Sequence, residues 1–173
     1  RRYVGNASRR LIEQAAPDAD SETVDRILEF YKPWYAAHCS VKTRPYDGIP
    51  ELLRRLHGAG HRLAIVSNKP DESVKELAEK FFPDVLETAV GESAGVRRKP
   101  WPDTAEAALK LMGEDKDSAV YVGDSEVDIQ TARNAGLPCI SVSWGFRSRE
   151  TLLNAGASVI VDSIDELERL LNE

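Results

Sequence analysis

The sequence has few cysteines and no long apolar run. Its 173 residues include two cysteines, Cys39 and Cys139, which lie far apart and show no metal-ligand spacing. We therefore expect reduced thiols, and neither a disulfide framework nor a zinc site. No window approaches the roughly 18 consecutive apolar residues of a membrane helix, and residues 1–6 lack the apolar segment of a signal peptide. The sequence thus predicts a cytoplasmic protein with no membrane partner.

Negative charge exceeds positive charge in this chain. It carries 23 lysines and arginines against 29 aspartates and glutamates, which gives a formal net charge of −6. Domains that bind nucleic acid usually have clustered positive charge, and here the short basic cluster at residues 97–99 is the exception. A nucleic-acid partner is therefore not expected. The length and the 42% hydrophobic content are typical of one compact core, with room for a small appended subdomain.

The pattern of apolar residues changes near residues 40–47. Before this point, apolar residues repeat at helical spacing in residues 7–16 and 20–38. After it, apolar runs typical of strands alternate with amphipathic helices that end in glycine, as in right-handed β-α-β units. The pattern predicts a doubly wound α/β domain with a mainly parallel sheet, preceded by a helical segment. Strands are expected within residues 61–68, 85–91, 118–125, 138–145 and 158–163.

Two carboxylates stand at the end of one predicted strand, at the edge where α/β sheets bind ligands. Asp124 ends the apolar run, and Asp128 follows about one helical turn later, so that both side chains can point to the same strand tip. Clustered hard oxygen ligands with room for water suit Mg²⁺. The alternative is that Asp124 caps the helix and that Asp128 is a solvated first-turn residue favoured by the helix dipole.

Two further signals lie in neighbouring loops. Ser67 and Asn68 follow another predicted strand, and a hydroxyl with backbone N–H groups at a helix start can hold a phosphoryl oxygen. Lys99 precedes a helix start, where an ammonium can neutralise charge on a transferring phosphoryl group. The alternatives are a plain turn and a surface lysine. Because all these residues stand at or beside the carboxyl ends of strands, the sequence predicts that they converge on one crevice.

Three stretches together resemble motifs two, three and four of the haloacid dehalogenase-like phosphohydrolases: LAIVSNKP, GVRRKPWPD and YVGDSEVDIQTARNAG. Others, YVGNASRRLIE, RPYDGIPELLRRL and VDSIDELERLL, are similar to the phosphoglycolate phosphatase branch. The resemblance implies a Mg²⁺-dependent phosphatase that hydrolyses a small phosphomonoester, such as 2-phosphoglycolate, through an aspartyl-phosphate. It implies that Ser67 and Asn68 bind the phosphoryl group and that Lys99 stabilises it. Asp124 would ligate Mg²⁺, and Asp128 would complete or buttress the metal site.

The same resemblance implies a division of the chain into two parts. Residues 1–42 are expected to be the C-terminal part of a helical cap that closes over the crevice and selects the substrate. Residues 43–173 are expected to be the Rossmann-type core. Arg44 and Tyr46 at the junction, together with Arg147 after a strand tip, are candidates for the substrate rim.

One part of the family pattern is absent from this sequence. The family uses a nucleophilic aspartate in an Asp-x-Asp-Gly-Thr motif, on a strand that lies between those ending here at Ser67 and Asp124. Residues 18–20 have the letters Asp-x-Asp, but Ala-Pro precedes them and no apolar strand delivers them to the crevice. We therefore expect a core without its first strand, a nucleophile segment outside this sequence, and no turnover by the 173-residue chain alone. The alternative is a non-catalytic relative that binds phosphate or a partner.

Overall fold

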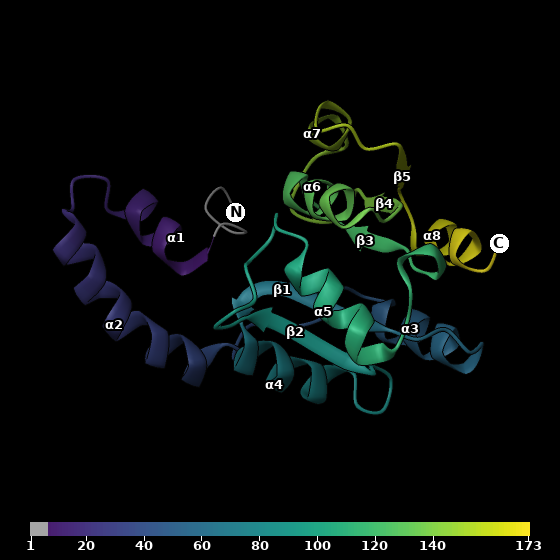
Figure 1. Cartoon of the computed structure of the whole chain (residues 1–173), viewed down its shortest axis with the longest axis horizontal. Helices are drawn as coiled ribbons and strands as arrows, with labels where there is room; N and C mark the ends of the chain where they lie inside the picture. Colours follow the sequence, from purple (N-terminus) through teal and green to yellow (C-terminus); the bar gives the residue numbers. More distant parts are fainter. Residues whose placement is uncertain (1–6) are drawn as a thin grey trace.

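The computed structural model describes residues 7–173, and residues 1–6 of the predicted cap lie outside the described residues. Two helices come first and an α/β part follows (Figure 1). The helices are α1 (Ala7–Ala15), α2 (Ser21–His38), α3 (Ile49–Gly58), α4 (Asp71–Phe81), α5 (Asp103–Met112), α6 (Glu126–Ala135), α7 (Arg149–Asn154) and α8 (Ile164–Leu171), with a 3-10 helix at Lys116–Ser118. The strands are β1 (Ala64–Pro70), β2 (Thr88–Glu92), β3 (Tyr121–Gly123), β4 (Cys139–Val142) and β5 (Val159–Val161).

The predicted α/β fold with parallel strands is confirmed. Strand β1 pairs with β2, and β4 pairs with both β3 and β5, in each case in parallel. Every strand overlaps the range predicted for it, because the apolar runs and the glycines that end the helices mark the elements locally. The strands form two sheets, with the orders β1-β2 and β3-β4-β5. Among the described residues, β1 and β3 are therefore edge strands.

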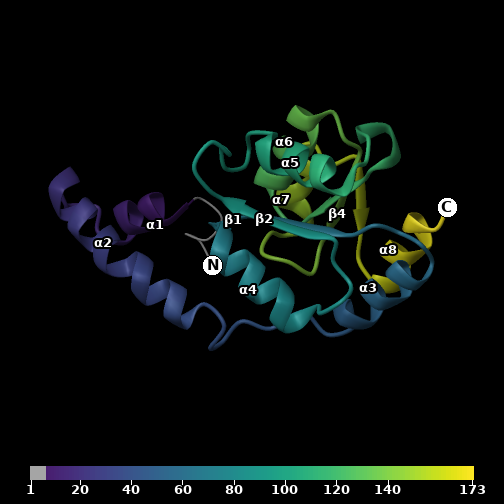
Figure 2. The ribbon, with the colours of Figure 1, turned by 60° about the horizontal axis from the view of Figure 1, so that its bottom comes forward.

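Helices cover both faces of these sheets, as in a doubly wound fold. One apolar cluster joins α3 and α8 to β4 and β5, and it contains Leu52, Leu56, Ile140, Val142, Val161 and Leu167. A second cluster joins α5 and α6 to β3, and it contains Ala105, Tyr121 and Ala132. Helix α4 packs against β2 through Val74, Ala78 and Ala89. Figure 2 shows α4 and α5 on opposite sides of the β1–β2 ribbon.

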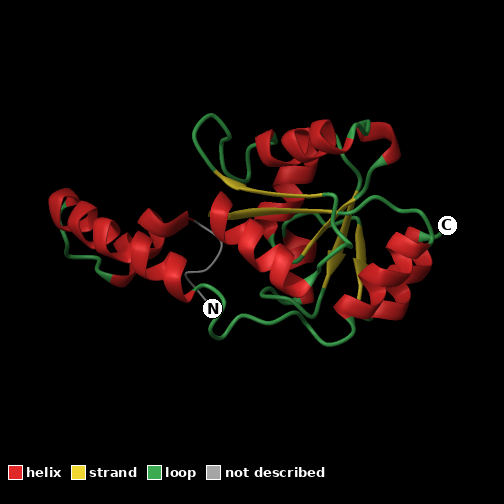
Figure 3. Ribbon diagram, turned by 90° about the horizontal axis from the view of Figure 1, so that it is seen from below, coloured by secondary structure: helices red, strands yellow, loops and turns green. Residues whose placement is uncertain are grey.

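Helices α1 and α2 form an arm that projects from the α/β part (Figures 1 and 3). The arm has a small apolar cluster of its own, made of Ile12, Val24 and Leu28. The other side of α2 exposes large apolar side chains, with Phe30 73% and Trp34 50% exposed. The arm thus has little core, and the division into cap and core at residue 42 stays a prediction.

Two further expectations concern membrane helices and disulfides. None of the helices in residues 7–173 combines the length and the apolar character needed to cross a lipid bilayer. Cys39 and Cys139 are both free thiols, and Cys39 is buried. The predicted cellular location and the expected lack of a nucleic-acid partner stay predictions.

A cavity of about 720 Å³ lies between the two sheets. It is lined by three residues of β1 and three of β3, namely Ala64, Ile65, Val66, Tyr121, Val122 and Gly123. Apolar side chains of α3, α5 and α8 line it as well, and the charged residues of its wall include Lys99, Asp124 and Asp128. Val122, in the middle of the edge strand β3, is 40% exposed. The edges of β1 and β3 thus border an apolar cavity.

Replacement of Leu52 by alanine tests the assigned core. Leu52 is 1% exposed within the cluster between α3, α8 and the sheet, and Leu52→Ala should lower the free energy of unfolding by about 2–5 kcal/mol through lost burial and an unfilled cavity. Leu153→Ala on α7 is the matched control, since this leucine is 54% exposed, and the change expected there is below about 0.5 kcal/mol. Urea unfolding followed by circular dichroism measures both, and equal losses would contradict this core.

Candidate active site

Lys99 and Asp128 form a buried ion pair. The Nζ atom of Lys99 lies 2.7 Å from Oδ1 of Asp128, and the two side chains are 14% and 8% exposed. Asp128 comes from the first turn of α6, and Lys99 comes from the loop between β2 and α5. Charges removed from water in this way are tolerated when further hydrogen bonds satisfy the remaining donors and acceptors.

The carboxylate of Asp128 has such hydrogen bonds on both oxygens. The hydroxyl of Tyr121 donates to Oδ1 at 3.2 Å, while the hydroxyl of Ser125 and the N–H of Asp124 donate to Oδ2 at 2.5 and 3.2 Å. Burial on its own raises the pKa of Asp128, but the charge of Lys99 and these hydrogen bonds outweigh it and hold that pKa below its usual value. Asp128 is therefore an ionised carboxylate, and both of its oxygens already accept hydrogen bonds.

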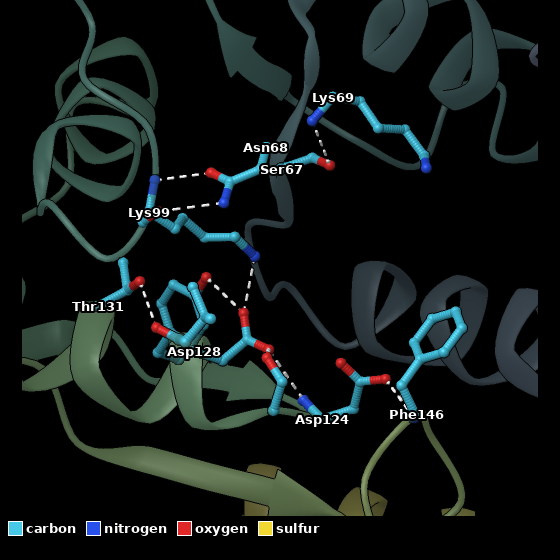
Figure 4. Close-up of polar contacts among 11 residues, drawn as sticks. Ser67, Asn68, Lys69, Lys99, Asp124, Asp128, Thr131 and Phe146 are labelled. Atoms are coloured by element: carbon cyan, nitrogen blue, oxygen red, sulfur yellow. Dashed lines mark hydrogen bonds and ion pairs between the residues drawn. The ribbon is translucent and has the colours of Figure 1, made fainter. Parts of the chain in front are cut away.

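Gly123 explains how Asp128 reaches the strand tip. A Cβ atom at position 123 would lie 2.2 Å from the Cβ of Asp128, a distance that real Cβ atoms do not show. Without a side chain there, α6 can start immediately after β3 and place Asp128 against the end of the strand (Figure 4). The Gly-Asp-Ser sequence thus combines a close approach, a carboxylate and a hydroxyl donor.

Asp124 differs from Asp128 in having one open oxygen. Its Oδ2 accepts a hydrogen bond from the N–H of Phe146 at 2.8 Å, and no hydrogen bond to Oδ1 is found within residues 7–173. Burial raises the pKa of Asp124, and the neighbouring charge of Asp128 adds to this, so that the pKa stays above its usual value although Phe146 and Lys99 lower it. A partly buried carboxylate of this kind favours a cation as its partner.

The donors present fit Mg²⁺ better than a metal bound by many side chains. Residues 7–173 contain no group of three or more His, Cys, Asp or Glu side chains that could hold a metal ion. Mg²⁺ commonly takes one or two protein carboxylates and completes its octahedron with water and substrate phosphate. Asp124 can offer Oδ1 to such an ion, whereas both oxygens of Asp128 are already engaged.

Asn68 and Ser67 lie at the carboxyl end of β1, beside Lys99. The side-chain oxygen of Asn68 accepts from the N–H of Lys99 at 2.7 Å, and its amide nitrogen donates to the carbonyl of Lys99 at 3.1 Å. Asn68 therefore holds the backbone of Lys99 in place. The Oγ atom of Ser67 accepts from the N–H of Lys69 at 3.2 Å, which leaves the hydroxyl hydrogen able to donate to a ligand.

The structure thus brings five of the predicted residues together at the ends of β1 and β3: Ser67, Asn68, Lys99, Asp124 and Asp128 (Figure 4). The alternative in which Asp128 is a solvated helix residue does not fit, because Asp128 is 5% exposed. The alternative of a surface lysine does not fit the buried Lys99. The roles of the five residues in binding and catalysis stay predictions.

Comparison with known proteins matches residues 1–142 to the model of the haloacid dehalogenase-like hydrolases. The chain belongs to this family. It is 34% identical over 154 residues to the phosphoglycolate phosphatase of Mesorhizobium japonicum, a match that covers 86% of this chain and 68% of that protein. It is 31% identical over 178 residues to the N-acetylmuramic acid 6-phosphate phosphatase of Pseudomonas aeruginosa, covering 99% of this chain and 79% of the relative.

Solved structures of the family have the same fold. The crystal structure of a provisionally assigned phosphoglycolate phosphatase from Lactobacillus delbrueckii superposes with a TM-score of 0.91 at 39% identity, over 98% of this chain and 80% of that one. A predicted phosphatase from Clostridium acetobutylicum superposes with a TM-score of 0.86 at 31% identity, over 99% and 79% of the two chains. The predicted resemblance to the phosphoglycolate phosphatase-like branch is therefore confirmed.

Within residues 7–173, the three other predicted residues make no hydrogen bond or ion pair with Lys99 or Asp128. Arg44 and Tyr46 are exposed in the segment between α2 and α3, and the described residues show no hydrogen bond or ion pair from either side chain. Arg147 lies in the loop after β4 and binds Glu126 through its guanidinium, with Nε 2.7 Å from Oε2. Their predicted place at the substrate rim stays a prediction.

Two contributors to the site were missed from the sequence. Tyr121 lies in a predicted strand, and a buried tyrosine hydroxyl usually needs a polar partner, which is a usable signal in the sequence. Phe146 contributes its backbone N–H, which leaves no signal in the sequence because every residue except proline carries one. Ser125 is the N-cap residue of α6, but its side chain makes no cap hydrogen bond, and its hydroxyl donates to Asp128 instead.

Replacement of Lys99 by methionine tests the buried pair. Lys99→Met leaves the carboxylate of Asp128 buried without its counter-charge, and the free energy of unfolding should fall by about 3–5 kcal/mol. Lys75→Met is the matched control, because Lys75 binds Asp71 at 2.6 Å but is 63% exposed, and a loss below about 1 kcal/mol is expected there. Chemical denaturation at neutral pH compares the two variants. Similar small losses in both would show that the pair at Lys99 is not a buried one.

Proposed function

We propose that this protein is a Mg²⁺-dependent phosphatase that hydrolyses a small phosphomonoester such as 2-phosphoglycolate. The observation that carries the proposal is the buried pair of Lys99 and Asp128 beside the half-open carboxylate of Asp124, at the strand ends of a chain in this family. The relatives are named for phosphoglycolate and for N-acetylmuramic acid 6-phosphate. These two substrates share a phosphate ester on a small carboxylic acid, which supports the same class here.

The two aspartates take different roles in this proposal. Asp124 would hold Mg²⁺ through Oδ1, and the bound ion would supply positive charge beside the phosphate oxygens. Asp128 is a positioning residue, because its oxygens hold Lys99, Ser125 and the backbone N–H of Asp124 in place. Asp128, whose oxygens are all hydrogen-bonded, thus orders the site, and Asp124 binds the metal ion.

Lys99 and Ser67 bind the phosphoryl group. An ammonium has three N–H donors, and one of those of Lys99 is directed at Asp128. The other donors and the hydroxyl of Ser67 can meet phosphoryl oxygens, where they oppose the negative charge that spreads over these oxygens during transfer. Asn68 holds Lys99 in position through two hydrogen bonds to the backbone of Lys99.

The nucleophile comes, in this proposal, from a further parallel strand in the cavity between the two sheets. Three features support this placement: the cavity is apolar, the edges of β1 and β3 border it, and Lys99, Asp124 and Asp128 line it as well. A strand that pairs with both edges would satisfy their free N–H and C=O groups. Its carboxyl end would lie between Ser67 and Asp124, next to the phosphoryl site.

An aspartate at the end of that strand would account for the chemistry. Its carboxylate oxygen attacks phosphorus, the ester P–O bond breaks, and the leaving alcohol oxygen takes a proton from an acid group. A water molecule then attacks the phosphorus of the aspartyl-phosphate, gives up a proton, and releases inorganic phosphate and the free carboxylate. Lys99 and Ser67 hold the phosphoryl oxygens in both steps.

The helical arm is proposed to be part of a cap that selects the substrate. The side chain of Lys69, next to Asn68 at the end of β1, reaches α2 and places Nζ 5.8 Å from the centroid of the Tyr35 ring. An ammonium at this distance from an aromatic face is attracted to it. The arm therefore meets the α/β part beside the proposed phosphoryl site, where a cap can close over the substrate.

The complete gene product and the 173-residue chain should differ in activity. The complete product should release phosphate from 2-phosphoglycolate with Mg²⁺ present and lose this activity in excess chelator. The chain alone should not turn over, because the described site lacks an in-line oxygen nucleophile. A phosphate-release assay over a panel of metabolite phosphates measures both. Turnover by the chain alone would contradict the proposed nucleophile, and binding without turnover by the complete product would favour a non-catalytic relative.

Ser67→Ala tests the proposed phosphoryl donor. Loss of one donor to the transferring group should lower kcat of the complete product by about 10²–10³-fold, since this hydroxyl acts on charge that develops during transfer. Ser163→Ala is the control, because Ser163 caps α8 through the N–H of Glu166 and is exposed. Steady-state kinetics at saturating Mg²⁺ should show kcat unchanged in the control. An unchanged kcat in Ser67→Ala would remove Ser67 from the mechanism.

A further inference from the structure

The loop after β4 lies directly against Asp124. The N–H of Phe146 in this loop donates to Oδ2 of Asp124 at 2.8 Å. A Cβ atom at position 145 would lie 2.2 Å from both Cβ and Oδ2 of Asp124, so only glycine lets the loop backbone approach this closely. Figure 4 shows the Asp124 carboxylate beside Phe146, with its second oxygen directed away from that residue. The loop therefore occupies one oxygen and leaves the other open.

The loop is tied to the chain segment that carries Asp124. Arg147, which follows Phe146, forms a two-point ion pair with Glu126 at the start of α6, with Nε–Oε2 and Nη2–Oε1 distances of 2.7 and 3.1 Å. The Arg147 side chain is 17% exposed and that of Glu126 is 43% exposed. Planar two-point pairs of this kind fix direction as well as distance. Asp124 is therefore held between its own helix start and the loop.

We propose that residues 145–147 and Glu126 form a clamp that positions Asp124 for a divalent cation. The clamp fixes the Asp124 carboxylate so that Oδ1 alone faces the ion, and Arg147 and Glu126 act as positioning residues without touching it. The inference rests on the proposed function, in which Asp124 is the metal ligand. Groups that orient a metal ligand typically change the metal affinity by about 10–100-fold when they are lost.

The sign of the effect of Arg147 separates the clamp from simple electrostatics. Arg147 follows Phe146, whose N–H binds Asp124, and its guanidinium binds Glu126 two residues after Asp124, so this cation lies close to the proposed metal site. By charge alone, removal of a nearby positive charge would strengthen the binding of a second cation. The clamp predicts the opposite, because Asp124 would lose its fixed orientation.

The deciding experiment measures the binding of Mn²⁺ and of Mg²⁺ to the complete gene product and its variants. Arg147→Gln should weaken binding by about 10–100-fold. Arg147→Lys keeps the charge but loses the two-point geometry, so its affinity for the ion should lie between those of Arg147→Gln and the wild type. Exchange of the pair in Glu126→Arg/Arg147→Glu should restore part of the affinity. Electron paramagnetic resonance of free Mn²⁺ and calorimetry with Mg²⁺ give the dissociation constants. The Mg²⁺ concentration needed for half-maximal activity should rise more than kcat falls.

Arg55→Gln is the matched control for the loss of an arginine–glutamate pair. Arg55 binds Glu168 at two points, both 2.6 Å, between α3 and α8 and away from Asp124. This variant should leave the metal affinity unchanged. Gly145→Ala is a second variant with both Arg147 and Glu126 intact, and it should also weaken binding, because the added Cβ must displace Asp124. Gly145→Ala therefore tests the clamp even if Arg147→Gln does not fold.

The outcomes separate this inference from the function on which it rests. If Arg147→Gln and Gly145→Ala fold and bind Mn²⁺ as tightly as the wild type, or more tightly, the clamp is overturned while the metal site stands. If the wild type binds no divalent cation, or if Asp124→Asn binds it equally well, Asp124 is not the ligand. That result would overturn the proposed metal site and the clamp together.

Discussion

The buried ion pair between Lys99 and Asp128 links the two halves of the α/β part. Lys99, in the loop between β2 and α5, is fixed to the first sheet, because Asn68 at the end of β1 holds its backbone. Asp128, in the first turn of α6, is fixed to the second sheet, because Tyr121 of β3 and the N–H of Asp124 hold its carboxylate. Charges with little access to water are costly unless each partner is present, so this pair fixes the distance between the ends of the two sheets. The cavity between the sheets and the geometry of the candidate site thus depend on the same contact.

The two aspartates show how surroundings divide similar groups into different roles. Asp128 accepts hydrogen bonds on both oxygens and faces an ammonium, so its pKa lies below the usual value despite burial. Asp124, four residues earlier, is partly buried beside the negative charge of Asp128, and these raise its pKa although the hydrogen bond from Phe146 lowers it. The Asp128 carboxylate is stable in its charged form, and the charged form of Asp124 would be stabilised by a bound cation. The proposed clamp extends this division, because it leaves one oxygen of Asp124 available.

The local parts of this arrangement were predictable from the sequence. The alternation of apolar runs with amphipathic helices gave the α/β fold, because these periods reflect which side of an element is buried. The placement of Ser67, Lys99 and Asp124 followed from the rule that ligands bind at the carboxyl ends of parallel strands. The periodicity could not show the split into two sheets, since strand pairing depends on which edges meet in space; the resemblance alone implied an absent strand between those ending at Ser67 and Asp124.

The sequence by itself determined the elements, the strand-end residues and, through the resemblance of its motifs, the family. Only the tertiary structure decided that Asn68 holds Lys99, that Tyr121 and Ser125 complete the shell of Asp128, and that the N–H of Phe146 occupies one oxygen of Asp124. The physical reason is that some features depend on neighbouring residues in the sequence and others on residues that meet only in the folded chain. Helix and strand periods are local, whereas these hydrogen bonds are set by packing, and several of them use backbone groups that every residue type shares.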